Sequence, residues 1–301
     1  HLNCPFRFFA GMVLRIEETE PPAQEFDARV RGLVLHDALE SLHRAYAGRA
    51  LAEVPPDELD ARAQTAVADA FEKHGWKSAA APRAIVTVEQ CRMEEQVARY
   101  ARIEREHGDA NWKPSHFEVG FGRAPGDTVE PPSATTPFVF RHQDLEAKFA
   151  GRIDRVDLQS AEEASPPQVR IVDYKTSRAP ETGDIAKGRC VQLTLYAWAV
   201  EALVLPESEC LSGAFVVPGK RLGKRNPYRE AIAMGKKGED REPQARQNIH
   251  HAITAIRAGQ FPPVRYDKKQ CEYCPCKDAC RFERARIERK TGQVREEDEN
   301  E

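Results

Sequence analysis

The pattern of apolar and polar residues changes near Pro114, and this change divides the chain into a helical part and a mixed part. Before Pro114, apolar residues recur every three or four positions, which is the spacing of one helix face. After Pro114, several short segments alternate apolar and polar residues, as half-buried strands do. The pattern therefore predicts an α/β protein with a mostly helical first third.

The individual elements follow from these two periods. In the first part we expect a short buried helix and three longer ones, one of which opens at a Pro-Pro-Asp tripeptide where Asp57 is placed to cap it. The helices are predicted over 4–12, 26–47, from 55–57 onward and 84–107. Strands are predicted over 115–121, 137–141, 146–158, 168–175 and 212–217, helices over 184–204 and 242–259, and loops over 125–137 and 160–167.

Composition indicates a soluble, charge-rich chain. Of the 301 residues, 31% are charged, and the net charge is −3. No apolar run approaches the roughly 20 residues of a membrane span, so we expect no membrane partner. The chain opens at His1 inside a helix-like segment, and we expect a fragment of a longer protein. We assign residues 1–290 to one domain, made of a first-cysteine segment (1–24), a helical part (25–108), a core (109–265) and a cysteine segment (266–290), with a polar tail over 291–301.

Two short motifs carry a candidate catalytic centre. Asp173 and Lys175 stand two apart at the end of an apolar strand, so their side chains share one face. Asp154 belongs to the preceding strand, in the sequence Gly-Arg-Ile-Asp-Arg-Val-Asp of 151–157. Carboxylates are hard ligands suited to Mg²⁺ or Mn²⁺, and a bound metal polarises a phosphodiester and acidifies water. Because a lysine beside that water can orient it, the set predicts a metal-dependent phosphodiesterase.

Other residues are candidates for the same site. Gly32 and His36 lie four apart on a predicted helix, hence on one face, and His36 could be a further metal ligand. Glu118 stands in the middle of a predicted strand, where an exposed polar position is the alternative reading. Gln192 and Tyr196 share a helix face and could reach a phosphate or a base edge, although ordinary helix amphipathicity also explains them.

In this order the residues resemble the PD-(D/E)XK nuclease superfamily, specifically its RecB-like branch. The resemblance rests on Gly32-x-x-x-His36, the strand residue Glu118, the motifs of 151–157 and 173–176, and Gln192-x-x-x-Tyr196. It implies a restriction-endonuclease-like mixed central sheet flanked by helices, with a C-terminal cluster-binding segment. It also implies His36, Asp154, Asp173 and the backbone carbonyl of Tyr174 as metal ligands, Lys175 as the water-orienting group, Glu118 as a supporting acid, and Gln192 and Tyr196 as DNA contacts.

Four cysteines bracket the chain, with Cys4 near one end and Cys271, Cys274 and Cys280 near the other. If all four bind one cofactor, the closed loop disfavours the unfolded chain by about 4–5 kcal/mol. Sets of four thiolates suit Zn²⁺ or an iron–sulfur cluster, and the spacing does not decide between them. The uneven spacing of the eight cysteines argues against a disulfide framework, so we expect a reducing, cytoplasmic compartment.

The resemblance favours iron over zinc. Some RecB-like nucleases, including the AddB subunit of AddAB helicase–nucleases and CRISPR-associated exonucleases, carry one cysteine before the nuclease motifs and three after, and these hold a [4Fe-4S] cluster. The likeness implies the same role for the four bracketing cysteines here. Cys276 falls outside that pattern, and we interpret it as a bystander.

A basic stretch with interspersed glycines covers residues 220–237. A solvated loop is one interpretation of this stretch. The other is a segment that follows the phosphate backbone of DNA, in which case Lys224 and Arg225 are candidate DNA contacts.

Together these features predict a metal-dependent DNA nuclease, and more narrowly an exonuclease in DNA end processing and double-strand break repair. By resemblance, the chain is expected to be the nuclease domain of an AddB-like helicase–nuclease, with a helicase-like segment before it and a helicase–nuclease partner subunit. The alternatives are a stand-alone RecB-like or CRISPR-associated-type exonuclease and a non-catalytic cysteine–metal module that binds DNA. No Gly-Lys-[Ser/Thr] phosphate loop is present, so the segment is not itself a motor.

Overall fold

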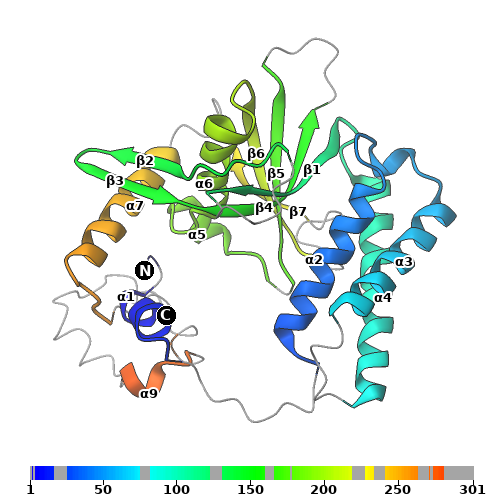
Figure 1. The fold of residues 1–301 in the computed structure, drawn as a ribbon, viewed down its shortest axis with the longest axis horizontal. Coiled ribbons are helices and arrows are strands. Elements are labelled where there is room, and N and C mark those ends of the chain that lie inside the picture. The colour runs from blue at the N-terminus through cyan, green and yellow to red at the C-terminus, as the bar shows by residue number, and fades with distance from the viewer. Residues whose placement is uncertain are drawn as a thin grey trace, which may run out of the picture.

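A five-stranded mixed sheet forms the centre of the molecule (Figure 1). The structure is a computed structural model, and it describes residues 2, 4–16, 26–74, 82–122, 131–159, 166–176, 178–218, 228–233, 241–263, 271 and 274–280. In the sheet, β5 and β6 run parallel, whereas the other neighbours run antiparallel. The strands in spatial order are β1 (Trp112–Phe121), β4 (Gly151–Gln159), β5 (Gln168–Tyr174), β6 (Glu209–Val216) and β7 (Tyr228–Ala233).

Three helices cover one face of this sheet. They are α2 (Ala28–Arg44), α3 (Pro56–His74) and α4 (Arg83–His107), with a 3₁₀ turn, η2 (Leu51–Glu53), between the first two. The carboxylate of Asp27 starts α2 by accepting hydrogen bonds from two backbone amides of its first turn. The apolar faces of the three helices form one core with Val172, Tyr174 and Val216 of the sheet, which secures α2 above β4 and β5.

The connection from β5 to the parallel β6 covers the opposite face. It contains α5 (Thr182–Ala186), α6 (Gln192–Ala199) and a π-helical turn, η4 (Val200–Val204). Leu193 and Ala197 of α6 pack into a second core with Ile153, Ile171 and Phe215. The molecule is therefore a mixed sheet between two helical layers, which confirms the predicted fold class.

A two-stranded hairpin extends to one side of the sheet, and helix α7 (Arg241–Arg257) packs against it. The hairpin strands are β2 (Phe138–His142) and β3 (Leu145–Phe149). Beyond it, two elements from distant parts of the sequence are neighbours in Figure 1: α1 (Pro5–Phe8) with the π-helical turn η1 (Phe9–Val13), and α9 (Lys277–Cys280). Among the described helices, none has the length and apolar character needed to cross a membrane.

Several predicted elements are divided differently in the structure. The strand expected over 146–158 is two strands, because the chain leaves the hairpin after β3 and enters the main sheet at Gly151. The helix expected over 184–204 is interrupted at Gly188, whose positive φ of 61° does not fit a right-handed helix. Part of the basic stretch is also not a loop, since β7 pairs with β6. The helix expected over 4–12 exists, but of α1 and η1 only Ala10 is buried, because Phe8 and Phe9 instead stack on Phe261 near the other end of the chain.

A fully buried ion network joins β4 and β5 beneath the first helical layer. The guanidinium of Arg155 lies 2.8 Å from Asp157 Oδ1, and Arg170 donates to Asp157 Oδ2 at 2.6 and 3.0 Å. Both Arg155 and Asp157 are inaccessible to solvent. A second amine of Arg155 lies 2.9–3.2 Å from His43 Nε2, Tyr100 Oη and Tyr174 Oη.

We predict that Asp157→Asn lowers the free energy of unfolding by about 3–5 kcal/mol. The substitution leaves two guanidinium groups without their buried counter-charge, and an unpaired buried charge is strongly destabilising. Urea denaturation followed by circular dichroism measures the change. Asp60→Asn is the matched control, because it removes an exposed pair with Arg102 and is expected to cost under about 1 kcal/mol. Equal losses in the two variants would contradict the assignment of Asp157.

Candidate active site

Three predicted site residues come together where α2 passes over the edge of the sheet. His36 of α2, Glu118 of β1 and Asp154 of β4 each offer a ligand atom, and these atoms all lie within 4.8 Å of one another. His36 Nδ1 is 3.5 Å from Asp154 Oδ1. Glu118 thus belongs to the group of potential metal ligands, although the sequence indicated only a supporting acid.

The backbone of β1 is distorted at Glu118. Its φ is +49°, a left-handed conformation that a residue with a side chain adopts at a cost of about 1–3 kcal/mol. Its neighbours Phe117 and Val119 are buried, whereas the Glu118 carboxylate is 2.7 Å from the exposed guanidinium of Arg152. The distortion directs an acidic side chain toward Asp154, and nothing in the local sequence indicates it.

Asp173 and Lys175 share one face of the sheet, as the spacing of two predicted. Lys175 Nζ lies 2.5 Å from Asp173 Oδ2. The side-chain amide of Gln192, at the start of α6, joins them by accepting from Lys175 Nζ at 3.1 Å and donating to Asp173 Oδ1 at 2.6 Å. The same amide is 3.2 Å from Tyr196 Oη. Gln192 therefore holds the acid and the ammonium in a fixed relation.

A backbone hydrogen bond connects the two groups of residues. The amide of Tyr174 donates to Asp154 Oδ2 at 2.7 Å, so the Asp154 carboxylate is held beside the residue that follows Asp173. The Tyr174 ring is buried in the core under α2. This bond fixes Asp154 with one oxygen on the backbone and the other toward His36. The role of the Tyr174 carbonyl as a metal ligand stays a prediction.

Burial and crowding raise the proton affinity of the site. Burial, and then the nearby charge of Asp154, raise the pKa of Asp173 to about 6, even though Lys175 opposes the shift. Burial is also the main cause that raises the pKa of Glu118 to about 7, against the effect of Arg152. For His36, burial lowers the pKa, but the hydrogen bond to Asp154 and the surrounding carboxylates outweigh it, so the pKa lies above 6.5. The site thus has more negative charge than its own cations balance.

Of the two motif glycines near the site, Gly151 is the one that close packing requires. A Cβ on Gly151 would lie 2.8 Å from the ring of Phe121 and 3.2 Å from that of Tyr196. On Gly32 of α2, a Cβ would lie 3.8 Å from the Thr176 methyl group, which places this turn of the helix directly over the end of β5. A side chain at position 151 would therefore overlap the two aromatic rings, whereas a Cβ at position 32 would make only an ordinary van der Waals contact.

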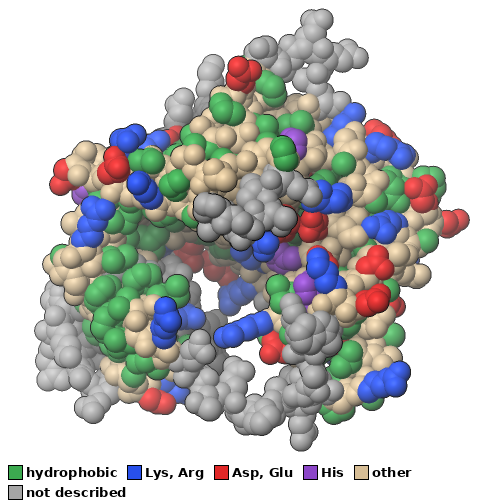
Figure 2. Space-filling view, viewed as in Figure 1, with side chains coloured by type: hydrophobic (Ala, Val, Ile, Leu, Met, Phe, Trp, Pro, Cys, Tyr) green, Lys and Arg blue, Asp and Glu red, His purple; other side chains and the backbone are tan. Residues whose placement is uncertain are grey.

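A cavity of about 1030 Å³ opens beside Lys175 and Gln192. Figure 2 shows this face of the molecule hollowed near its centre, with acidic, basic and histidine side chains gathered around the hollow. The aromatic rings of Phe121, Phe149 and Tyr196 form part of the cavity wall, and several cations lie at its edge. The cavity offers an approach to the site for a ligand that is both anionic and aromatic.

The bracketing cysteines lie in the region where the chain ends meet. Cys4 precedes α1, Cys280 ends α9, and these helices are neighbours in Figure 1. Burial raises the pKa of the Cys276 thiol, the thiols of Cys274 and Cys4 raise it further, and the guanidinium of Arg7 lowers it, so Cys276 lies within electrostatic range of all three. Cys276 is thus a buried neighbour of the candidate ligands. Lys224 and Arg225 lie outside the described residues, and their contact with DNA stays a prediction.

Comparison with known proteins agrees with this geometry. The family model described as the PD-(D/E)XK nuclease superfamily matches residues 1–281. This chain belongs to the PD-(D/E)XK nuclease superfamily. It is also similar to an ATP-dependent helicase/deoxyribonuclease subunit of Symbiobacterium thermophilum, with 31% identity over 230 residues. That alignment covers 72% of this chain but only 18% of the relative, so the chain spans under a fifth of that protein.

Three residues near the site were not indicated by the sequence. Arg152 lies inside the quoted motif, but only the structure pairs it with Glu118. Arg155 is one residue from Asp154, yet it points to the buried network rather than to the site. Arg7, from the opposite end of the chain, lines the cavity beside Lys175. The motif spacing could have indicated the first two, whereas no local pattern points to Arg7.

We predict that Gly151→Ala lowers the free energy of unfolding by about 1–3 kcal/mol, because the new methyl group overlaps the rings of Phe121 and Tyr196. Thermal or urea denaturation measures the loss. Gly183→Ala is the matched control: a Cβ there meets nothing within 4 Å, and in α5 alanine is expected to leave stability unchanged or raise it by up to about 1 kcal/mol. Equal stability of Gly151→Ala and Gly183→Ala would contradict the close contact between Gly151 and the two rings.

Proposed function

We propose that this chain is a metal-dependent deoxyribonuclease that hydrolyses phosphodiester bonds and acts as an exonuclease, leaving a 5′-phosphate and a 3′-hydroxyl. The observation that carries the proposal is the His36–Glu118–Asp154 group beside the Asp173–Lys175 pair. One group is suited to a cation, and the other presents an ammonium next to it. Hydrolysis of a phosphodiester requires both charge neutralisation and a positioned water.

The donor set fits Mg²⁺ or Mn²⁺. It consists of carboxylate oxygens and one imidazole, which suit hard or borderline divalent cations. The pKa of Glu118 at about 7 and that of Asp173 at about 6 indicate crowded carboxylates that a divalent cation would relieve. His36, Glu118 and Asp154 would hold it, with Asp173 completing the charge of the site. When bound, the cation would supply charge for the phosphate and acidify a water molecule.

Lys175, Gln192 and Tyr196 would have separate roles in the reaction. Lys175, held by Asp173 and Gln192, would orient the attacking water and offset the charge that develops on the phosphate. The amide of Gln192 is already engaged by both residues, so its main contribution would be to position Lys175. Tyr196 lines the cavity and would contact the nucleotide next to the scissile bond.

We further propose an AddB-like role in DNA end processing and double-strand break repair. The support is the likeness to a protein named as a subunit of an ATP-dependent helicase/deoxyribonuclease. In this proposal the chain works with a helicase-like segment and a helicase–nuclease partner subunit. A stand-alone exonuclease is the nearest alternative, and strand-end assays on the full-length protein separate the two.

We also propose that Cys4, Cys271, Cys274 and Cys280 hold a [4Fe-4S] cluster with a structural role. The thiols of Cys4 and Cys274 both act on the Cys276 thiol, which supports a shared cofactor in this region.

Asp173→Asn is expected to reduce cleavage of a labelled DNA strand by about a thousandfold or more, because Lys175 loses its partner and the site loses charge. Binding of the same strand without Mg²⁺ should remain, since removing a negative charge does not weaken attraction to phosphate. Asp69→Asn, on an exposed position of α3, is the control and should cleave at the wild-type rate. Retained cleavage by Asp173→Asn would refute the nuclease centre, and a wild-type chain that binds but never cleaves would favour the non-catalytic module.

Anaerobically purified protein is expected to absorb broadly near about 400 nm and to contain about four irons per chain. Cys280→Ser should lose both signals together with thermal stability, because the two chain ends lose their link. Cys91→Ser, at an exposed position on α4, should keep them. One zinc per chain and no iron would overturn the cluster and the narrower AddB-like assignment, while leaving the nuclease centre to be judged by Asp173→Asn.

A further inference from the structure

The cavity beside Lys175 contains more positive charge than its own carboxylates neutralise. Four cations line it within the part of the chain that the structure describes, namely Arg7, Lys175, Arg178 and Arg189. Three of them already have carboxylate partners at 2.5–3.3 Å: Lys175 with Asp173, Arg178 with Glu181, and Arg189 with Asp184. Arg7 is the remaining cation.

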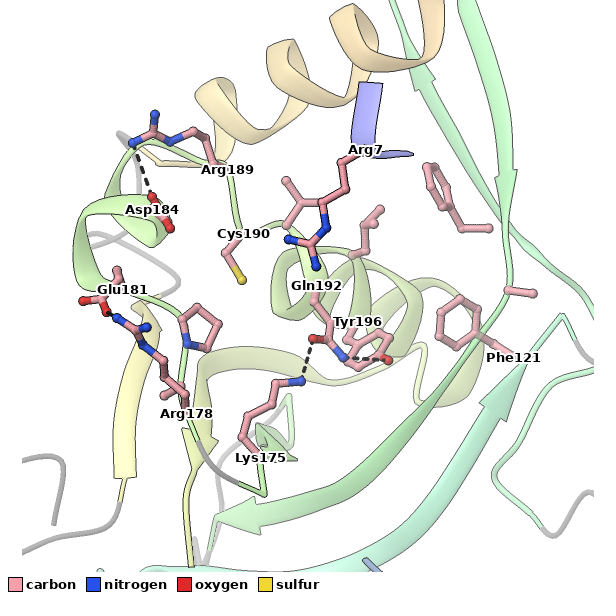
Figure 3. Close-up of a pocket in the computed structure, with 16 residues that line it drawn as sticks. Arg7, Phe121, Lys175, Arg178, Glu181, Asp184, Arg189, Cys190, Gln192 and Tyr196 are labelled. Carbon is pink, nitrogen blue, oxygen red and sulfur yellow. Dashed lines mark hydrogen bonds and ion pairs between the residues drawn. The ribbon is translucent and has the colours of Figure 1, made fainter. Parts of the chain in front are cut away.

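Arg7 reaches the cavity from the far end of the sequence. It is an exposed residue of α1, and among the described residues no carboxylate lies within ion-pair distance of it. Figure 3 shows its guanidinium group pointing into the cavity toward Gln192, above the side of the cavity where Lys175 lies. The charge of Arg7 also lowers the pKa of the Cys276 thiol. A guanidinium group that has no carboxylate partner among the described residues and lies beside a candidate catalytic lysine is placed for an anionic ligand.

We propose that Arg7 binds a backbone phosphate of the DNA single strand next to the phosphodiester that is cleaved. This inference rests on the proposed nuclease function and adds a strand-binding residue from the cysteine-bracketed end. The aromatic wall of Phe121 and Tyr196 suits the bases of the same strand, since base–aromatic stacking tolerates any sequence.

The position of Arg7 is maintained by contacts between the two ends of the chain. The ring of Phe9, two residues after Arg7, stacks on Phe261 with centroids 4.8 Å apart. Phe8 stacks on the same ring at 6.3 Å. Because α1 is fixed in this way, the guanidinium group is presented to the cavity with little loss of backbone entropy on binding.

The test measures binding of a fluorescent single-stranded oligonucleotide without Mg²⁺, by anisotropy, between about 50 and about 200 mM salt. Arg7→Ala is expected to raise Kd about tenfold at low salt, because one charged hydrogen-bond donor is lost. The slope of log K against log salt should become shallower by about 0.7, the value for one phosphate contact on a single strand. Arg7→Lys should keep Kd and the salt slope close to their wild-type values, because it keeps the positive charge.

Arg15→Ala is the matched control, because this substitution removes the same charge from the same exposed segment, at a residue that does not line the cavity. It should leave Kd and the salt slope unchanged. In cleavage assays with Mg²⁺, Arg7→Ala should raise KM about tenfold with kcat nearly constant, since binding and not the chemical step is affected.

Wild-type values of Kd and salt slope in Arg7→Ala would overturn the inference, as would equal losses in Arg15→Ala. Iron content and melting temperature are recorded for every variant. If Arg7→Ala changes either of them, Arg7→Gln takes its place and is judged by the same slope, because it keeps the length and polarity of the side chain. Failure of the nuclease proposal would appear separately, as retained cleavage by Asp173→Asn.

Discussion

Asp157 of β4 lies directly opposite Arg170 of β5, and their buried ion pair determines which residues of the two strands face each other. In the same register Asp154 comes beside the end of β5, where the Tyr174 amide binds its carboxylate. A shift of one residue would move Asp173 and Lys175 to the opposite face of the sheet. It would also leave Arg170 without its buried counter-charge, which is strongly unfavourable. The ion network thus specifies the register on which the candidate site depends.

The candidate site contains buried carboxylates and a backbone conformation that are unfavourable by themselves. Two of its carboxylates have raised pKa values because they are buried and close to other acids, and Glu118 adopts a backbone conformation that few residues with side chains adopt. Such features persist only where the surrounding structure enforces them. Here the surroundings are two packed helical layers and the buried ion network below the site. The stable core therefore supports a crowded acidic group that would not assemble by itself.

The sequence predicted the sheet-and-helix architecture because that depends on short-range periodicity, whereas most candidate site residues came from the family resemblance. Asp173 and Lys175 share a face simply because strands repeat every two residues. Features that depend on long-range contacts were not predictable in this way. The division of 146–158 depends on which sheet each half joins, the strand at 228–233 depends on the exposed edge of β6, and the partial exposure of Phe8 and Phe9 depends on Phe261. The positive φ of Glu118 and the engagement of Gln192 by both Asp173 and Lys175 likewise have no local signal.

The contact of α1 with the segment around Phe261 also has a consequence for the order in which the protein matures. A ribosome makes the chain from its N-terminus, so α1 emerges before the sheet, but Phe261, on which Phe8 and Phe9 stack, emerges after every described strand. The motif residues can therefore be assembled while the cavity still lacks Arg7. The cavity is therefore completed only after the whole sheet has been made, and a chain that ends before Phe261 would carry the acidic residues without the finished wall beside them.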